Sequence, residues 1–168
     1  MDKIKRPKSV CQFRVTLREI EPAVWRQIQV PASYSFWDLH VAIQDAMGWL
    51  DCHLHAFLCG GGDEFGDTEI GRPNPNAFEG ESVAKPGWKV KVATFFHRPG
   101  DAALYRYDFG DCWEHDVVLE GTLLGEPGVK YPRCIAGARA CPPEDCGGFP
   151  GYEHLVKVLS DPKDREYE

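Results

Sequence analysis

The chain has 168 residues, of which 43% are hydrophobic and 27% charged, a composition that indicates one globular domain and excludes a disordered or fibrous protein. Its net charge of −7 argues against a broad surface for nucleic acid or anionic membranes. No apolar run approaches the ~20 residues of a membrane span and the polar start is no signal peptide, so we expect a cytoplasmic protein without a membrane partner. We assign residues 1–168 to a single domain with its core at 10–163, and expect the basic arm 1–9 and the tail 161–168 to be mobile.

An antiparallel β-hairpin is predicted at the start of the domain. Residues 10–20 alternate apolar and polar side chains, and Glu21-Pro22 interrupts the pattern. Residues 23–30 alternate again until Pro31 stops them. Two alternating runs joined by so short a break favour a hairpin.

The most clearly marked helix follows the hairpin. Ser35 can cap it, with Asp38 three residues on in a variant of the capping box. Apolar residues recur at helical spacing as far as Met47, and Gly48 ends the helix. His40 lies on the apolar stripe, where a core histidine with a hydrogen-bond partner is a commoner finding than a metal ligand.

Residues 52–59 read as a further strand, with His53 and His55 on the same face. Two histidines two apart on a strand project in parallel and can hold a metal jointly. The alternative is that this face of the sheet is exposed to solvent and that His53 and His55 lie on it without binding a metal. Residues 60–87 then form a long acidic loop rich in Gly and Pro, with room for a short strand, and residues 90–97 fit a short helix.

The stretch at 105–120 predicts two strands joined by a tight turn. Asp108 and Asp111 flank Gly110, and short carboxylates at such positions bond nearby backbone amides. The return strand places His115 on the same face as a Trp, a Val and a Leu. An imidazole that faces inward needs a partner, and we expect His115 to pack beside the loop around residues 143–148 and to bond a carboxylate or a metal there.

Cysteines cluster in the stretch at 131–152, whose Pro-Pro and Gly-Gly breaks indicate a compact loop without regular structure. The chain has seven cysteines and no secretion signal, so we expect them to be reduced and the clustered ones to be metal-ligand candidates. Cys134, Cys141 and Cys146 are separated by six and four residues, and three thiolates can bind zinc together with a fourth ligand. That ligand could come from His53, His55, His115 or His154. The alternative is three small residues buried in a loop.

Several carboxylates could serve general acid–base or hard-metal chemistry. Glu144 and Asp145 precede Cys146, and Asp108 and Asp111 lie in the hairpin turn. The catalytic candidates are Asp108, Asp111, His115, Glu144 and Asp145. Acids beside turns also commonly cap backbone amides, which is the alternative role. The sequence lacks four common enzyme motifs: a phosphate-binding glycine loop, a dinucleotide fingerprint, the Gly-x-Ser-x-Gly elbow and the His-Glu-x-x-His helix.

A last helix is predicted at residues 151–160.

Three stretches together resemble a known family: FWDLHVAIQDAMGWLDCHLHAF, YRYDFGDCWEHDVVLE and CIAGARACPPEDCGGFPGY. The resemblance is to the plasmid pRiA ORF-three-like proteins, named after the third open reading frame of a root-inducing plasmid. It implies a single α+β domain of antiparallel strands and a few helices. The family has no assigned biochemical activity, and some members carry the label of transposon passenger proteins.

The fold expected is therefore α+β, an antiparallel sheet packed with two or three helices and carrying a long acidic loop. The first functional hypothesis is a binding or accessory module for a protein or nucleic-acid partner, associated with mobile elements. The alternative is a metal-dependent hydrolase or nuclease that uses Asp108, Asp111, His115 and the loop from Cys134 to Cys146. A second alternative gives those cysteines a structural zinc in an interaction domain. An exposed sheet edge could also support a homodimer.

Overall fold

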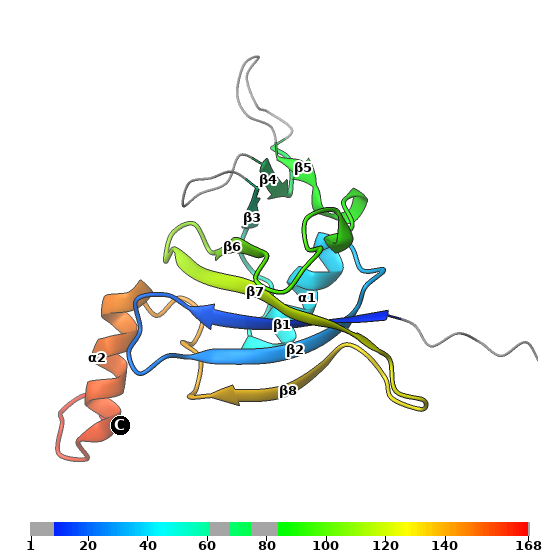
Figure 1. Ribbon diagram of the computed structural model, residues 1–168. Coiled ribbons are helices and arrows are strands. Elements are labelled where there is room, and N and C mark those ends of the chain that lie inside the picture. Colours follow the sequence, from blue (N-terminus) through cyan, green and yellow to red (C-terminus); the bar gives the residue numbers. More distant parts are fainter. Residues whose placement is uncertain (1–8, 61–67, 75–83, 168) are drawn as a thin grey trace, which may run out of the picture.

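The backbone is organised around one curved sheet of eight strands in the order β5-β4-β3-β6-β7-β1-β2-β8 (Figure 1). The computed structural model describes residues 9–60, 68–74 and 84–167. The strands are β1 Ser9–Leu17, β2 Trp25–Pro31, β3 His55–Cys59, β4 Thr68–Gly71, β5 Lys85–Pro86, β6 Ala102–Tyr107, β7 Trp113–Leu124 and β8 Arg133–Ala138. Every neighbouring pair is antiparallel except β4 and β5, which are parallel. The expected α+β single domain is confirmed.

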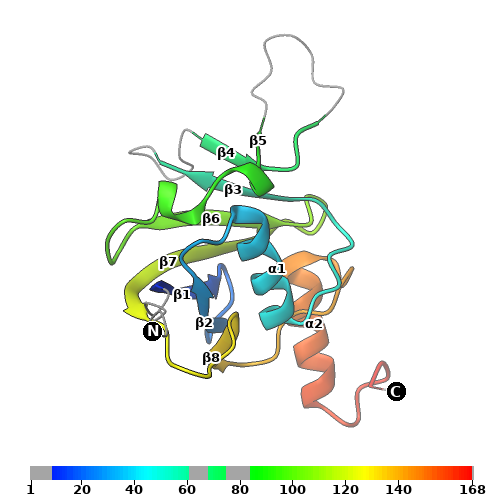
Figure 2. The same cartoon turned by 90° about the vertical axis from the view of Figure 1, so that its right-hand side faces the viewer.

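Two α-helices accompany the sheet, α1 Phe36–Met47 and α2 Gly148–Ser160. Helix α1 lies across one face of the sheet, whereas α2 stands beyond the strand ends (Figures 1 and 2). The capping box at the start of α1 is present: the Ser35 hydroxyl accepts from the Asp38 backbone N–H, and the Asp38 carboxylate accepts from the Ser35 backbone N–H at 2.8 Å. Gly48 ends the helix in the left-handed conformation, as its position in the sequence predicted.

The core fills the space between α1 and the sheet. Phe36 of α1 makes edge contacts with Phe57 of β3, and Phe13 of β1 makes one with Phe96. Tyr105 and Tyr107 of β6 are completely buried beneath them. The ends of β3 and β6 are therefore fixed against α1, and the loops that leave these ends start from rigid positions.

The two predicted hairpins are confirmed as β1–β2 and β6–β7. The region expected as a short helix at 90–97 contains only the 3₁₀ turn η2 Val92–Thr94, and η1 Gly87–Lys89 precedes it. The acidic loop includes the short strands β4 and β5. Its remaining parts at 61–67 and 75–83, and residues 1–8 of the basic arm, lie outside the described residues.

One expectation about the cysteine-containing stretch was wrong, because Arg133–Ala138 is strand β8 and not part of an irregular loop. It pairs with β2, which otherwise would have no partner on that side. Arg26 of β2 lies close to β8 at Gly137, where an added Cβ would come within 2.8 Å of the Arg26 side chain. The last helix starts at Gly148 rather than Gly151.

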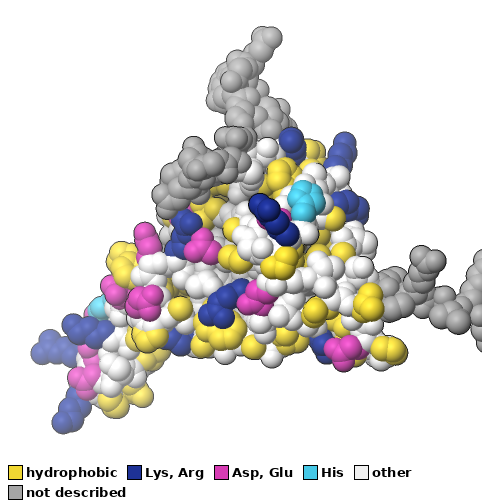
Figure 3. Space-filling view, in the orientation of Figure 1, with side chains coloured by type: hydrophobic (Ala, Val, Ile, Leu, Met, Phe, Trp, Pro, Cys, Tyr) yellow, Lys and Arg dark blue, Asp and Glu magenta, His cyan; other side chains and the backbone are white. Residues whose placement is uncertain are grey.

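The surface carries charges of both signs. On the face in Figure 3, the Lys and Arg side chains that the figure colours are scattered among acidic and apolar ones and form no continuous basic area. Among the residues described, there is no helix with the length and apolar character needed to cross a membrane.

Candidate metal centre

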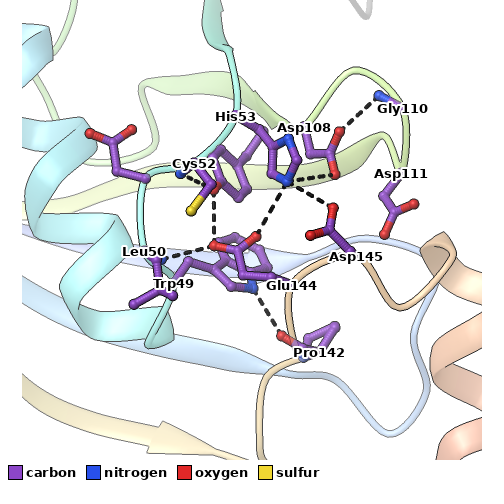
Figure 4. Close-up of polar contacts among 12 residues, drawn as sticks. Trp49, Leu50, Cys52, His53, Asp108, Gly110, Asp111, Pro142, Glu144 and Asp145 are labelled. Carbon is purple, nitrogen blue, oxygen red and sulfur yellow. Dashed lines mark hydrogen bonds and ion pairs between the residues drawn. The ribbon is translucent and has the colours of Figure 1, made fainter.

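Three segments far apart in the sequence meet at one end of β3 and β6 (Figure 4). They are the segment after α1 at 49–54, the β6–β7 turn at 108–112 and the loop before α2 at 140–147. The Trp49 indole N–H donates to the Pro142 carbonyl at 2.8 Å, which fixes the first segment to the third. The Asp108 backbone N–H donates to the Leu54 carbonyl at 3.0 Å, which fixes the first to the second.

Four side chains from these segments converge on one point. The His53 Nε2 atom lies 2.9 Å from Asp145 Oδ1, 3.6 Å from Asp108 Oδ2 and 4.0 Å from Glu144 Oε2. Figure 4 shows the imidazole between the carboxylates, with Glu144 on one side and Asp108 and Asp145 on the other. One ligand atom from each of His53, Asp108 and Asp145 can be chosen so that all lie within 4.8 Å of one another.

Two atoms of this cluster are buried without a hydrogen-bond partner, His53 Nε2 and Glu144 Oε2. His53 Nε2 is close to Asp145, but the direction does not suit a hydrogen bond, so proximity alone does not satisfy it. Buried polar atoms are nearly always bonded, and an exception needs an explanation. The two atoms lie 4.0 Å apart, so both are candidate ligands for one cation.

Glu144 is held firmly by its other oxygen. Its Oε1 atom accepts from the Leu50 backbone N–H at 2.8 Å and from the Tyr107 hydroxyl at 3.0 Å. Burial and the bond to Glu144 raise the pKa of Tyr107, so the hydroxyl keeps its proton and continues to donate. This arrangement leaves Oε2 free and directed toward His53.

Asp108 is oriented by the turn itself. Its backbone is left-handed, with φ 54°, a conformation that Asp tolerates better than most residues. Its Oδ1 atom accepts from the Gly110 N–H at 2.9 Å, and Oδ2 therefore faces His53. Asp108 and Glu144 each use one carboxylate oxygen to hold the loop and present the other to the same point.

The donor set suits a divalent cation. One imidazole nitrogen and up to three carboxylate oxygens are ligands that Mn²⁺, Fe²⁺ and Zn²⁺ accept. The Asp145 side chain is 74% exposed while that of Asp108 is 10% exposed, so the cluster is buried on one side and open to solvent on the other. We call His53, Asp108, Glu144 and Asp145 the open site.

The remaining catalytic candidates lie outside the open site. Asp111 accepts from the Gly147 N–H at 3.1 Å through Oδ2 and so binds the turn to the start of α2. His115 is completely buried, and its Nδ1 lies 3.3 Å from the Tyr105 carbonyl oxygen. The expected bond from His115 to a carboxylate is not formed, because β7 directs this ring toward Trp49 and Tyr105 in the core.

The three clustered cysteines do not converge. Cys134 is exposed on β8 opposite Ile28, whereas Cys141 lies 3.0 Å from Arg26 Nη2. Burial raises the pKa of Cys141 and of Cys146, which disfavours their thiolates. Within the described ranges, each group of three candidate ligands is made of His and Asp alone, and all seven cysteines are free. The three-thiolate zinc site expected from the sequence therefore has no counterpart among these groups.

His53 and His55 do not share a site either. The strand begins at His55, so the alternation assumed in the sequence does not extend back to His53. His53 joins the open site, while His55 stacks on His40 in the interior. The contact with His40 was missed, although both histidines had been recognised, because helix periodicity and strand periodicity do not show which faces meet.

Comparison with known proteins places the chain in a family. The crystal structure of a protein of unknown function, MM3350 from Methanosarcina mazei Go1, has a TM-score of 0.82 and 39% sequence identity, covering 95% of this chain and 86% of that one. The uncharacterized protein y4hQ of Sinorhizobium fredii (strain NBRC 101917 / NGR234) is 34% identical over 155 residues, covering 92% of this chain and 75% of y4hQ. The family description "plasmid pRiA4b ORF-3-like protein" matches residues 9–168. This match confirms the resemblance seen in the sequence, and the chain belongs to the plasmid pRiA4b ORF-3-like protein family.

Proposed function

We propose that this protein is a metal-dependent hydrolase that binds one divalent cation in the open site. The observation that carries this proposal is the pair of buried, unpartnered atoms, His53 Nε2 and Glu144 Oε2, beside two further carboxylates. A cation between them would provide the partner that both atoms lack.

The charges of the open site also favour a cation. Ligand oxygens of Asp108 and Asp145 lie within 4.8 Å of each other. Two carboxylates at that distance repel by roughly 1 kcal/mol in water and by about 4 kcal/mol at the lower effective dielectric of a protein surface. A divalent cation converts this repulsion into attraction, and the hydrogen bonds that already orient Asp108 and Glu144 reduce the cost of ordering the ligands.

The exposure of Asp145 supports hydrolysis rather than a purely structural ion. Structural metal sites are closed, whereas catalytic sites keep positions open for water and substrate. A cation in the open site would lower the pKa of a bound water and polarise a substrate oxygen. Asp145, with its side chain 74% exposed, is the carboxylate best placed to accept a proton from that water.

Metal content is the decisive measurement. Protein purified without chelator should contain Mn, Fe or Zn by elemental analysis, and Mn²⁺ titration followed by electron paramagnetic resonance should reveal a site. Glu144→Gln and Asp145→Asn should each weaken binding about tenfold or more. Asp45→Asn, on the exposed side of α1, is the matched control and should change nothing. Turnover of chromogenic ester and phosphodiester substrates should disappear with chelator and return with metal. Unchanged affinity in both site variants would refute the proposal.

A second candidate function is the partner-binding module expected from the sequence. Three apolar side chains next to the open site, Leu50, Leu54 and Phe109, are 76%, 53% and 52% exposed. Exposed apolar side chains that gather around a site favour contact with a partner or a large substrate. The double variant Leu54→Ser, Phe109→Ser should lose a partner that co-purifies with the wild type, while its metal content stays the same. Retention of that partner by the variant would exclude this surface.

A further inference from the structure

A second cluster of candidate ligands consists of two buried histidines and one exposed aspartate. His40 comes from α1, Asp51 follows that helix, and His55 begins β3. The His40 and His55 rings stack with centroids 3.4 Å apart and planes 9° from parallel. One ligand atom from each of the three residues can be chosen so that all lie within 4.8 Å of one another. We call these three residues the inner cluster.

Two of its members are held by a hydrogen-bonded frame. The Gln44 side-chain amide donates to the Tyr105 hydroxyl at 3.0 Å, and that hydroxyl lies 2.8 Å from His40 Nδ1. The Gln44 side-chain oxygen accepts from the Asp51 backbone N–H at 3.0 Å. This frame fixes the His40 ring so that Nε2 lies 2.8 Å from Asp51 Oδ1. Partners of this kind orient metal-bound histidines in proteins.

The third member lacks a partner. His55 is only 5% exposed, and its Nε2 atom is buried without a hydrogen bond. The imidazole beside it is the ring of His40, which stacks on it and offers no in-plane contact. A buried polar atom left without a partner costs on the order of 1–3 kcal/mol. The frame around His40 is thus complete, while one ring nitrogen of His55 has no partner.

A small cavity lies beside His55, whose Nε2 atom itself stays buried. It has a volume of about 170 Å³ and is lined by Asp51 and His55 together with Trp37 and Arg72. His53 of the open site also lines it. A cavity of this size holds several waters or a hydrated ion. His55 therefore has both an unsatisfied atom and adjacent space.

We propose that the inner cluster is a second cation site, which takes a divalent transition metal through His40 Nε2, Asp51 Oδ1 and His55 Nε2. Two imidazole nitrogens and one carboxylate oxygen form a donor set for Zn²⁺, Fe²⁺ or Co²⁺, with coordination positions left open. The two rings stack in nearly parallel planes, so binding requires the His55 ring to turn into the adjacent cavity until Nε2 of both histidines faces the ion. His40 then carries its remaining proton on Nδ1 and donates to the Tyr105 hydroxyl.

The inner cluster uses none of the four side chains of the open site as a ligand, so the two sites can be tested with separate variants and with Zn²⁺ and Co²⁺ as probes. Asp51→Asn is the main variant, because Asn keeps an oxygen that accepts from His40 and the Asp51 side chain is 40% exposed, so the fold should persist. His55→Gln is the second variant, and Asp45→Asn is again the control. Equilibrium dialysis with reduced thiols gives the equivalents bound, and ¹⁵N-histidine NMR reports the ring nitrogens.

The expected result is that Asp51→Asn and His55→Gln each lose one equivalent that the control retains. In the wild type, Zn²⁺ should shift the Nε2 resonances of two buried histidines, and Co²⁺ should give a visible absorption that both variants lose. If neither variant reduces the equivalents bound and no buried histidine resonance shifts, the inner cluster is not a metal site. An equivalent lost in Asp145→Asn but not in Asp51→Asn would support the open site alone, and the converse would support the inner cluster alone.

Discussion

The interior of this protein and the open site surround histidine side chains with different chemical groups. His55 and His115 lie in the interior, where burial lowers their pKa values to about 3 and about 4. His53, in the open site, faces three carboxylates and is partly exposed. Burial therefore favours the neutral form of the interior rings, whereas the open site gathers carboxylates around a ring nitrogen.

The difference shows how a single short segment serves two environments. Asp51, His53 and His55 are two residues apart, yet only His53 faces the open site. The segment runs irregularly from the end of α1 and becomes a strand only at His55, so the side chains do not alternate as they would in a continuous strand. The predictions below test whether protonation changes the stability contributed by the interior histidines and whether the carboxylates of the open site determine cation affinity.

Outside the two proposed cation sites, the largest expected effect is the loss of stability in acid that arises from His115. Its pKa is about 4 in the folded protein, below the ordinary 6.5 that it regains on unfolding, because burial disfavours the charged ring. Between these values the unfolded state binds more protons, so the contribution is complete above pH 6.5 and is lost as pH falls toward 4. The loss should be on the order of 3 kcal/mol, measured by urea denaturation at a series of pH values.

A variant pair isolates this contribution. His115→Gln keeps an N–H that can donate to the Tyr105 carbonyl but does not titrate, so its stability should vary less with pH in this range. His97→Gln, at an exposed position, should retain the wild-type dependence. If the free energy of unfolding falls by the same amount between pH 6.5 and pH 4 in both variants and in the wild type, His115 does not cause that loss.

A smaller loss, about 2 kcal/mol, is expected from Tyr105→Phe. The Tyr105 hydroxyl bonds both His40 Nδ1 and the Gln44 side chain, and its removal leaves two buried groups without this partner. The effect should appear as a lower denaturation midpoint without a change in Mn²⁺ affinity of the open site. Because Tyr107 bonds Glu144, Tyr107→Phe is the contrasting variant and should weaken Mn²⁺ binding. Equal Mn²⁺ affinities in the two variants would contradict this separation.

Local sequence signals predicted the parts of the fold that depend on neighbouring residues. The Ser35 cap, the Gly48 end of α1 and the tight turn at Gly110 all follow from short-range hydrogen bonds and backbone preferences. Strand β8 was missed because its sequence, RCIAGA, lacks a clear apolar–polar alternation; its position depends on pairing with β2. Regular structure that is imposed by a partner strand leaves little trace in its own sequence.

The residues of the open site were all among the candidates, but their convergence was not predictable. His53, Asp108 and Glu144 come from three segments whose contacts depend on the Trp49 bond to the Pro142 carbonyl, between residues 93 apart in the sequence. Their chemistry was visible as residue type, whereas their geometry depends on packing over that distance. The cysteines show the opposite case, since proximity in sequence suggested a three-thiolate site, whereas the groups of three candidate ligands among the described residues contain His and Asp alone.

The smallest expected effect concerns Asp111, which lies next to the open site without belonging to it. Its carboxylate accepts from the Gly147 N–H at the start of α2, so Asp111→Ala should cost about 1 kcal/mol of unfolding free energy. Asp111→Asn keeps an oxygen acceptor and should stay close to the wild type. Mn²⁺ affinity should be the same in both variants, in contrast to Asp145→Asn on the same side of the open site. If Asp111→Ala lowers the free energy of Mn²⁺ binding by more than it lowers the free energy of unfolding, Asp111 is a fifth member of the open site. Its carboxylate would then bind the cation as well as support the loop before α2.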